Sequence, residues 1–130
     1  MVGTENKLEF DEEKMKKAIQ GYSRVDITEE QEEMIDMFAE ILHDSVGLWK
    51  NMLRSFIYIS ISLWQKEKQA FAKDFASADP KIRLENILQA AEKLRTLLRG
   101  VLKKSGQEER LDQAINQGLS VYQQKWMYRE

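Results

Sequence analysis

Hydrophobic residues in the first half of the chain recur at alternating intervals of three and four positions. The repeat lasts about four heptads and consists, with one serine, of Ile35, Phe38, Leu42, Ser45, Trp49, Met52, Phe56, Ile59 and Leu63. Side chains at this spacing lie on one side of an α-helix. A hydrophobic stripe of that length has to be covered by other helices, so it predicts an all-α, coiled-coil-like protein.

Capping residues and the only proline mark where the helices begin. Asp11 and Thr28 can each accept hydrogen bonds from a first helical turn, and Gln31 completes a capping box with Thr28. Asp79 followed by Pro80 is typical of another helix start. The predicted helices cover residues 11–22, 28–75, 80–104 and 107–128, after a flexible N-terminal segment of residues 1–10.

Gly47 lies in the middle of the longest predicted helix. A glycine costs about 1 kcal/mol relative to alanine inside a helix, so a break into two helices near Gly47 is the alternative. Because the hydrophobic stripe keeps its phase across Gly47, we expect one continuous helix. The turns before the third and fourth helices are short, which favours antiparallel neighbours. Residues 1–130 are therefore expected to form a single domain, an antiparallel up-and-down bundle of four helices, or five with the break.

The length of the helix predicted over residues 28–75 favours self-association. At about 1.5 Å per residue it would be about 70 Å long, and the third helix covers only about half of that length. The uncovered part of the stripe would then need a second copy, most simply in a two-fold homodimer. Trp64 lies off the main stripe, and tryptophan is enriched at interfaces. The residues expected at the dimer interface are Phe38, Leu42, Trp49, Phe56 and Trp64.

Composition excludes several classes of protein. The chain has 130 residues, no cysteine and one histidine, so disulfides, thiolate catalysis and cysteine-based zinc sites are excluded. The longest strongly apolar run, residues 55–64, is about half of the roughly 20 residues that a membrane-spanning helix needs. We therefore expect a cytoplasmic protein that does not contact membranes.

Charge is distributed unevenly along the chain. Residues 1–45 contain thirteen acidic and five basic side chains, and the remaining residues contain nine acidic and fifteen basic ones. Arg95, Arg99 and Lys103 are spaced four residues apart on one face of the third predicted helix. We expect this basic stripe to contact a partner or a phosphate group, first of all the acidic N-terminal part of the chain. Nucleic acid is the less favoured partner, because no recognition motif accompanies the stripe.

Two acidic patterns have the spacing of metal ligands, but neither predicts a metal site. Glu40-x-x-His43 is half of a carboxylate di-iron motif, but the chain has no second pair of this kind. The acidic run of residues 29–36 suits the start of a capped helix, because acidic side chains interact favourably with the N-terminal end of a helix dipole. Nucleophile and phosphate-binding motifs are also missing from the sequence. No catalytic, cofactor-binding or metal-binding residues are therefore predicted.

The sequence thus favours a non-catalytic role. We expect a protein–protein interaction or regulatory protein that acts as a self-associating helical module. The alternatives are a bundle that senses a small molecule in its interior and a nucleic-acid-associated regulator that uses the basic stripe.

Overall fold

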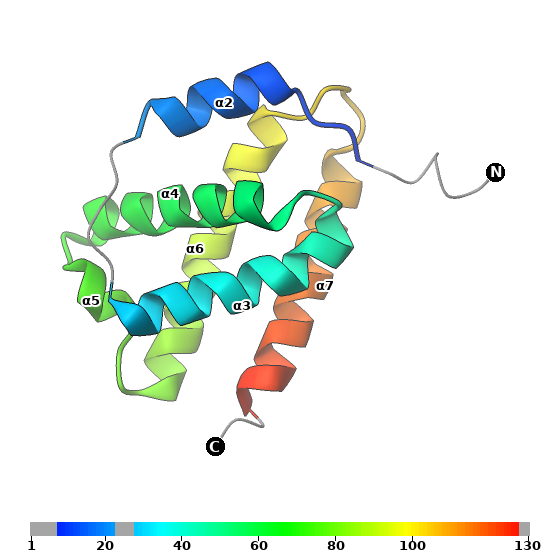
Figure 1. Cartoon of the computed structure of the whole chain (residues 1–130). Helices are drawn as coiled ribbons and strands as arrows, with labels where there is room; N and C mark the ends of the chain where they lie inside the picture. The colour runs from blue at the N-terminus through cyan, green and yellow to red at the C-terminus, as the bar shows by residue number, and fades with distance from the viewer. Residues whose placement is uncertain (1–7, 23–27, 128–130) are drawn as a thin grey trace.

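The computed structural model describes residues 8–22 and 28–127, which form six α-helices (Figure 1). The helices are α2 (Glu12–Gln20), α3 (Glu29–Val46), α4 (Lys50–Lys68), α5 (Ala72–Phe75), α6 (Pro80–Gly100) and α7 (Glu108–Met127). Within these residues β-structure is limited to one isolated bridge. The prediction of an all-α protein is confirmed, and α2 and α7 begin within one residue of their predicted starts. No helix in the described ranges is long and apolar enough to cross a membrane.

The four long helices form two helical pairs around one core. α3 packs against α4 and α7, and α6 packs against α4 and α7. Figure 1 shows the α6–α7 pair behind the α3–α4 pair and running across it. The two helices within each pair run in opposite directions, as expected for neighbours joined by short turns. The pairs are crossed, however, whereas an up-and-down bundle has all four helices nearly aligned.

The prediction of one continuous helix over residues 28–75 is wrong, because the chain reverses at Gly47. This glycine adopts the left-handed conformation, with φ of 85°, and its N–H donates to the His43 carbonyl over 3.1 Å. The His43 ring then donates through Nδ1 to the Leu48 carbonyl over 2.6 Å. Trp49 is the N-cap of the next helix. The two halves of the hydrophobic stripe therefore lie on two helices that pack against each other.

A second break separates α4 from the one-turn helix α5. Gln69 ends α4 in the left-handed conformation, with φ of 52°. The Phe71 N–H donates to the Asp74 carboxylate over 3.2 Å, which starts α5. Nδ2 of the buried Asn86 donates to the Asp74 and Phe75 carbonyls, each over 3.3 Å. α5 is therefore fastened to α6 as well as to the end of α4.

The first described residues pair with the segment that follows α6. The Asp11 N–H donates to the Val101 carbonyl over 2.8 Å, and the Lys103 N–H donates to the Glu9 carbonyl over 2.8 Å. These backbone groups bond across the molecule and not along a helix, so α6 ends at Gly100. The helix predicted over residues 80–104 is therefore too long at its C-terminal end.

The same pairing corrects the prediction of a flexible N-terminal segment over residues 1–10. Residues 8–10 are held against the α6–α7 connection, where Glu9 also forms an ion pair of 3.1 Å with Lys104. Residues 1–7 lie outside the described part of the chain.

Close packing of α3 against α7 shapes the centre of the core. A Cβ atom built on the buried Gly118 of α7 would lie 2.3 Å from Cδ2 of Leu42 on α3. One helical turn away on each helix, the Phe38 and Tyr122 rings meet edge to face with centroids 5.3 Å apart. Protein interiors are so closely packed that adding one methyl group to such a contact lowers stability. The glycine therefore sets how closely these two helices approach.

Candidate interaction surface

Four of the five residues predicted at a dimer interface are covered by their own chain. Phe38, Leu42, Phe56 and Trp64 belong to the buried core, and Trp64 is only 4% exposed. The stripe needed a second copy only if it lay on one long helix. The reversal at Gly47 removes that need, because the two halves of the stripe, apart from Trp49, pack within the chain.

Trp49 is the exception among the predicted interface residues. Its side chain is 80% exposed, more than any other large hydrophobic residue in the described ranges. Trp49 is also the N-cap of α4, and it makes no side-chain hydrogen bond to the helix. Serine, threonine, aspartate or asparagine would cap the helix at this position. The exposed indole therefore contributes neither a cap nor a buried surface to the fold.

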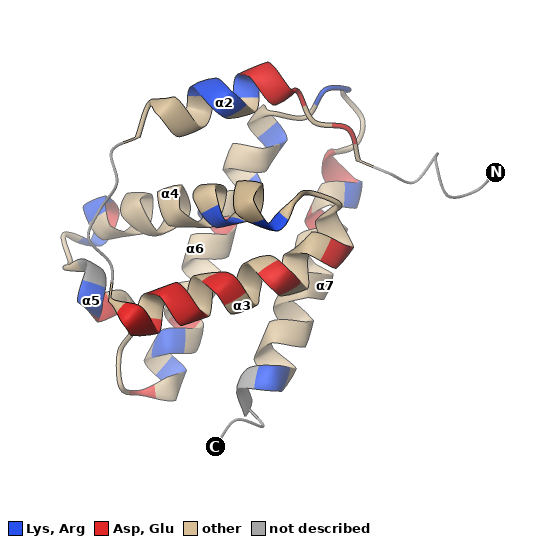
Figure 2. Cartoon of the chain, in the orientation of Figure 1, with Lys and Arg blue, Asp and Glu red and all other residues tan. Residues whose placement is uncertain are grey.

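An acidic face of α3 leads up to the α3–α4 turn that carries Trp49. Figure 2 shows acidic residues along the whole length of α3. Asp36 and Glu40 form ion pairs with Arg54 and Lys50 of α4, at 2.6 and 3.9 Å. The other exposed acids of α3 have no ion-pair partner among the described residues, and they are Glu29, Glu30, Glu32, Glu33 and Asp44. Acids in the first turn also interact favourably with the helix dipole, so fold stability explains part of this face.

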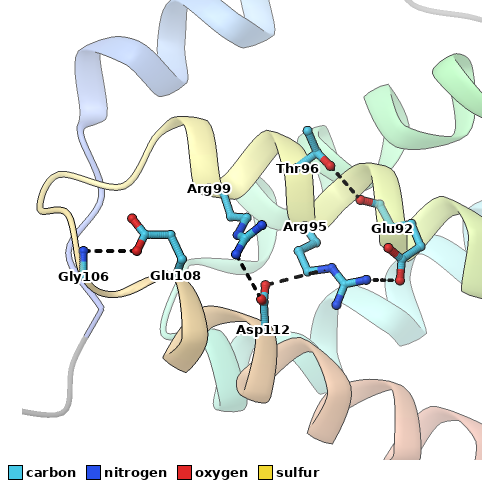
Figure 3. Close-up of polar contacts among 7 residues, drawn as sticks. All are labelled: Glu92, Arg95, Thr96, Arg99, Gly106, Glu108 and Asp112. Atoms are coloured by element: carbon cyan, nitrogen blue, oxygen red, sulfur yellow. Dashed lines mark hydrogen bonds and ion pairs between the residues drawn. The ribbon is translucent and has the colours of Figure 1, made fainter.

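The predicted basic stripe is divided by ion pairs within the chain (Figure 3). Arg95 pairs with Glu92 on its own helix, and its Nε lies 3.9 Å from Asp112 of α7. Arg99 lies 3.3 Å from the other Asp112 carboxylate oxygen. The Lys103 side chain is exposed and has no ion pair in the described part of the chain. The two arginines thus pair with α6 and α7, and not with the acidic N-terminal part of the chain as expected.

His43 has a structural contact in place of the rejected metal role. Its ring holds the α3–α4 turn through the Leu48 carbonyl, while Glu40 pairs with Lys50. Within residues 8–22 and 28–127, no three His, Asp or Glu side chains converge in a way that could hold a metal ion.

A groove of about 320 Å³ between α2, α3 and α4 bears on the small-molecule alternative. Its lining includes Tyr22, Tyr58, Arg54 and Ser62. Arg54 is engaged by Asp36, and the Ser62 hydroxyl donates to the carbonyl of Tyr58 on its own helix over 3.1 Å. Specific ligand sites place polar groups that converge on the ligand, and these two groups are used within the protein. The groove therefore does not favour a ligand over filling by solvent.

Besides Trp49, the exposed large hydrophobic residues of the described ranges are Phe71, Ile82 and Leu88, and none of the three is among the residues predicted at an interface. Phe71 precedes α5 and is 71% exposed, and Ile82 in the first turn of α6 is 45% exposed. In the predicted helix that begins at Pro80, hydrophobic residues recur at helical spacing from Leu84 to Ile87, Ala91 and Leu94, and Ile82 falls outside this series. This position is the signal that could have identified Ile82.

Comparison with known proteins gives no relative from which a function could be transferred. No protein-family model matches the chain, and neither a curated protein nor a solved structure matches it significantly. Function therefore has to be argued from the exposed residues themselves.

Proposed function

We propose that this chain is a non-catalytic protein–protein interaction module and that Trp49 is its main contact residue. The observation that carries the proposal is an almost fully exposed tryptophan at a position where tryptophan does not help the helix begin. Tryptophan is enriched among the residues that dominate the binding energy of protein interfaces. Covering such a side chain on binding removes a large apolar area from water.

The charges around Trp49 define the kind of partner surface that we propose. The acidic face of α3 ends close to the tryptophan, with Asp44 three residues before the turning residue Gly47. A partner with an apolar pocket bordered by lysine or arginine would complement both features. Complementary charge increases the rate of association and restricts the choice of partner.

The proposal also includes self-association, a regulatory role and a cytoplasmic location. Self-association is supported by the uneven charge along the chain, because opposite charges on different parts of one surface allow two copies to pair. A binding module without catalytic groups acts by bringing its partners together or by blocking them, which is the basis for the regulatory role.

Site-specific photo-crosslinking tests this proposal in the cells that produce the protein. A benzoylphenylalanine at position 49 should give a discrete crosslinked product containing one partner protein. The same group at the exposed Gln113 of α7 is the control and should give none. A chain that forms no discrete product from position 49, or the same products from both positions, contradicts Trp49 as the contact residue.

A Trp49→Ser variant provides the matched measurement. Serine supplies the missing cap and removes the indole. We expect the variant to fold at least as stably as the original protein and to lose binding of the crosslinked partner by tenfold or more, on the order of a hot-spot residue. Unchanged affinity would contradict the proposal.

A further inference from the structure

The end of the molecule opposite Trp49 carries a cluster of lysines around exposed hydrophobic side chains. We call it the lysine corner, and it consists of Lys66, Lys68, Phe71, Lys73, Lys81 and Ile82. Figure 2 shows basic residues at the C-terminal end of α4, on α5 and at the start of α6. The corner thus combines positive charge with an exposed phenylalanine and an exposed isoleucine.

The lysines of this corner are not neutralised within the described part of the chain. Lys68, Lys73 and Lys81 have no carboxylate within ion-pair distance there. Lys73 lies 5.8 Å from the centre of the Phe71 ring. Three acids lie near these lysines in the sequence: Glu67 forms an ion pair with Lys93, and Asp74 and Asp79 accept hydrogen bonds from backbone N–H groups at helix starts. The four lysines outnumber the two acids that have no ion pair. The corner therefore presents a net positive surface.

Four of the five unpaired acids of α3, Glu29, Glu30, Glu32 and Glu33, lie in its first turns and at the same end of the molecule as the lysine corner. Two ion pairs, Glu40 with Lys50 and Asp36 with Arg54, fix the register of α3 against α4. The helices are antiparallel, so a residue four positions later in α4 lies beside a residue four positions earlier in α3. Continued at this rate, the register brings the start of α3 level with Ser62. From Ser62 to its end at Lys68, α4 therefore extends about 10 Å beyond the start of α3, at about 1.5 Å per residue.

The positive lysine corner and the negative first turns of α3 lie side by side, and this arrangement favours one kind of partner. An anionic membrane or a nucleic acid presents one sign of charge over a wide area, so it would be repelled by Glu29, Glu30 and Glu33 when it approached the lysines. A second copy of this chain carries both signs at the same spacing. A two-fold axis between the two patches would bring the positive patch of each copy onto the negative patch of the other.

We infer that the lysine corner and the first turns of α3 form a self-complementary dimer interface, with Phe71 and Ile82 covered at its centre. This inference rests on the proposed self-association and uses a surface different from that of Trp49. Each contact then occurs twice, and the exposed hydrophobic side chains gain cover that the single chain does not provide.

A charge-swap experiment tests the inference by sedimentation equilibrium. The first variant combines Lys73→Glu with Lys81→Glu, and the second combines Glu29→Lys with Glu33→Lys. Each variant alone should dissociate at least tenfold more readily than the original protein, because like charges then face each other. An equimolar mixture should form a heterodimer, since both contacts in it again join opposite charges.

Matched controls separate the inference from changes in folding and from the Trp49 proposal. Lys14→Glu with Lys17→Glu makes the same change of charge on α2 and should leave dimerisation unchanged. Thermal unfolding followed by circular dichroism checks that every variant folds. Trp49→Ser should still dimerise, so a failure of the Trp49 proposal leaves this test intact.

The outcomes that overturn the inference are distinct. A strictly monomeric original protein at high concentration overturns it, as does a variant pair that dimerises separately but not together. Vesicles containing an anionic phospholipid give a further readout. Binding of the original monomer to these vesicles, lost in the Lys73→Glu, Lys81→Glu variant, would assign the corner to a membrane surface instead.

Discussion

The two tryptophans of α4 are in opposite environments. Trp49 at the start of the helix is 80% exposed, and Trp64 near its end is 4% exposed. Trp64 meets the ring of Phe75 edge to face, with centroids 5.2 Å apart. At the first end the chain arrives through an open turn, whereas at the second it folds back over the helix as α5. The connections that follow and precede a helix thus decide which of its hydrophobic residues are buried.

The two ends also differ in how their polar groups are arranged. At the Trp64 end, Asn86 fastens α5 through two backbone carbonyls. The indole N–H of Trp64 itself has no hydrogen-bond partner among the described residues, so burial of its ring has to offset that cost. At the Trp49 end, the His43 ring holds the turn through the Leu48 carbonyl, and the Trp49 indole makes no hydrogen bond to the helix that it precedes. The polar groups at the Trp64 end hold a buried ring in place, whereas the Trp49 end leaves a large side chain exposed.

The largest expected difference between the ends is the cost of removing each tryptophan. Trp64→Ala should lower the free energy of unfolding by about 3–5 kcal/mol, because it leaves a cavity in the core. Trp49→Ser should raise it by about 0.5–1 kcal/mol, because serine caps the helix. Urea unfolding followed by circular dichroism measures both. Similar costs at the two positions would show that the comparison is wrong.

Asn86→Ala tests what holds α5 over Trp64. Loss of the two hydrogen bonds leaves the Asp74 and Phe75 carbonyls without this partner, so we expect a loss of about 1–3 kcal/mol. Faster hydrogen exchange in α5 than in α3 would locate the effect. Thr96→Ala on the exposed face of α6 is the control and should cost less than about 0.5 kcal/mol.

Gly47 and Gln69 end the helices at the two corners in the same left-handed conformation, but only one of them is a glycine. Gly47→Ala should lower the free energy of unfolding by about 1–2 kcal/mol, because a Cβ atom disfavours this conformation. Gln69→Gly should raise it by up to about 1 kcal/mol for the same reason. Thermal unfolding of the two variants gives the comparison. If both substitutions changed the free energy of unfolding in the same direction, the left-handed conformation would not explain the difference between the two positions.

The smallest effect concerns an ion pair between α4 and α6. A hydrogen bond from Lys93, together with its charge, lowers the pKa of Glu67 below its usual value. A carboxylate with a lowered pKa stabilises the folded state above the pKa of the unfolded chain, and this stabilisation is lost as the pH falls through the folded pKa. Lys93→Met should raise the pKa of Glu67 toward its ordinary value. A carbon-detected NMR titration measures the change, and Lys104→Met is the control that should leave it in place.

The helix starts could be predicted from the sequence because they depend on nearby residues. Asp11 accepts hydrogen bonds from the N–H groups of Glu13 and Lys14. Thr28 forms the capping box with Gln31, and Asp79 accepts from the N–H of Lys81 over 2.9 Å. Each of these contacts joins residues two or three apart, so residue type and spacing alone identify it.

The helix breaks could not be predicted in the same way. The turn at Gly47 returns the hydrophobic stripe in phase, so periodicity alone does not distinguish a reversal from a continuous helix. The break at Gln69 has no glycine or proline, and α5 depends on Asn86, a residue far along the chain. The ion pairs of Arg95 and Arg99 with Asp112 likewise depend on how α6 meets α7. Trp49 belongs to the stripe that the sequence predicts to be covered, whereas its exposure follows from the turn at Gly47.

The contact between Gly118 and Leu42 carries a consequence for natural variation of this protein. Because the Leu42 side chain occupies the space that a Cβ atom at position 118 would need, the residues at positions 42 and 118 share a single volume. A larger residue at 118 can be accommodated only where the residue at 42 is smaller. In related chains with this architecture, a larger residue at one of the two positions should therefore accompany a smaller residue at the other. Replacing both residues together in this way should preserve the fold, whereas enlarging the residue at 118 alone should weaken it.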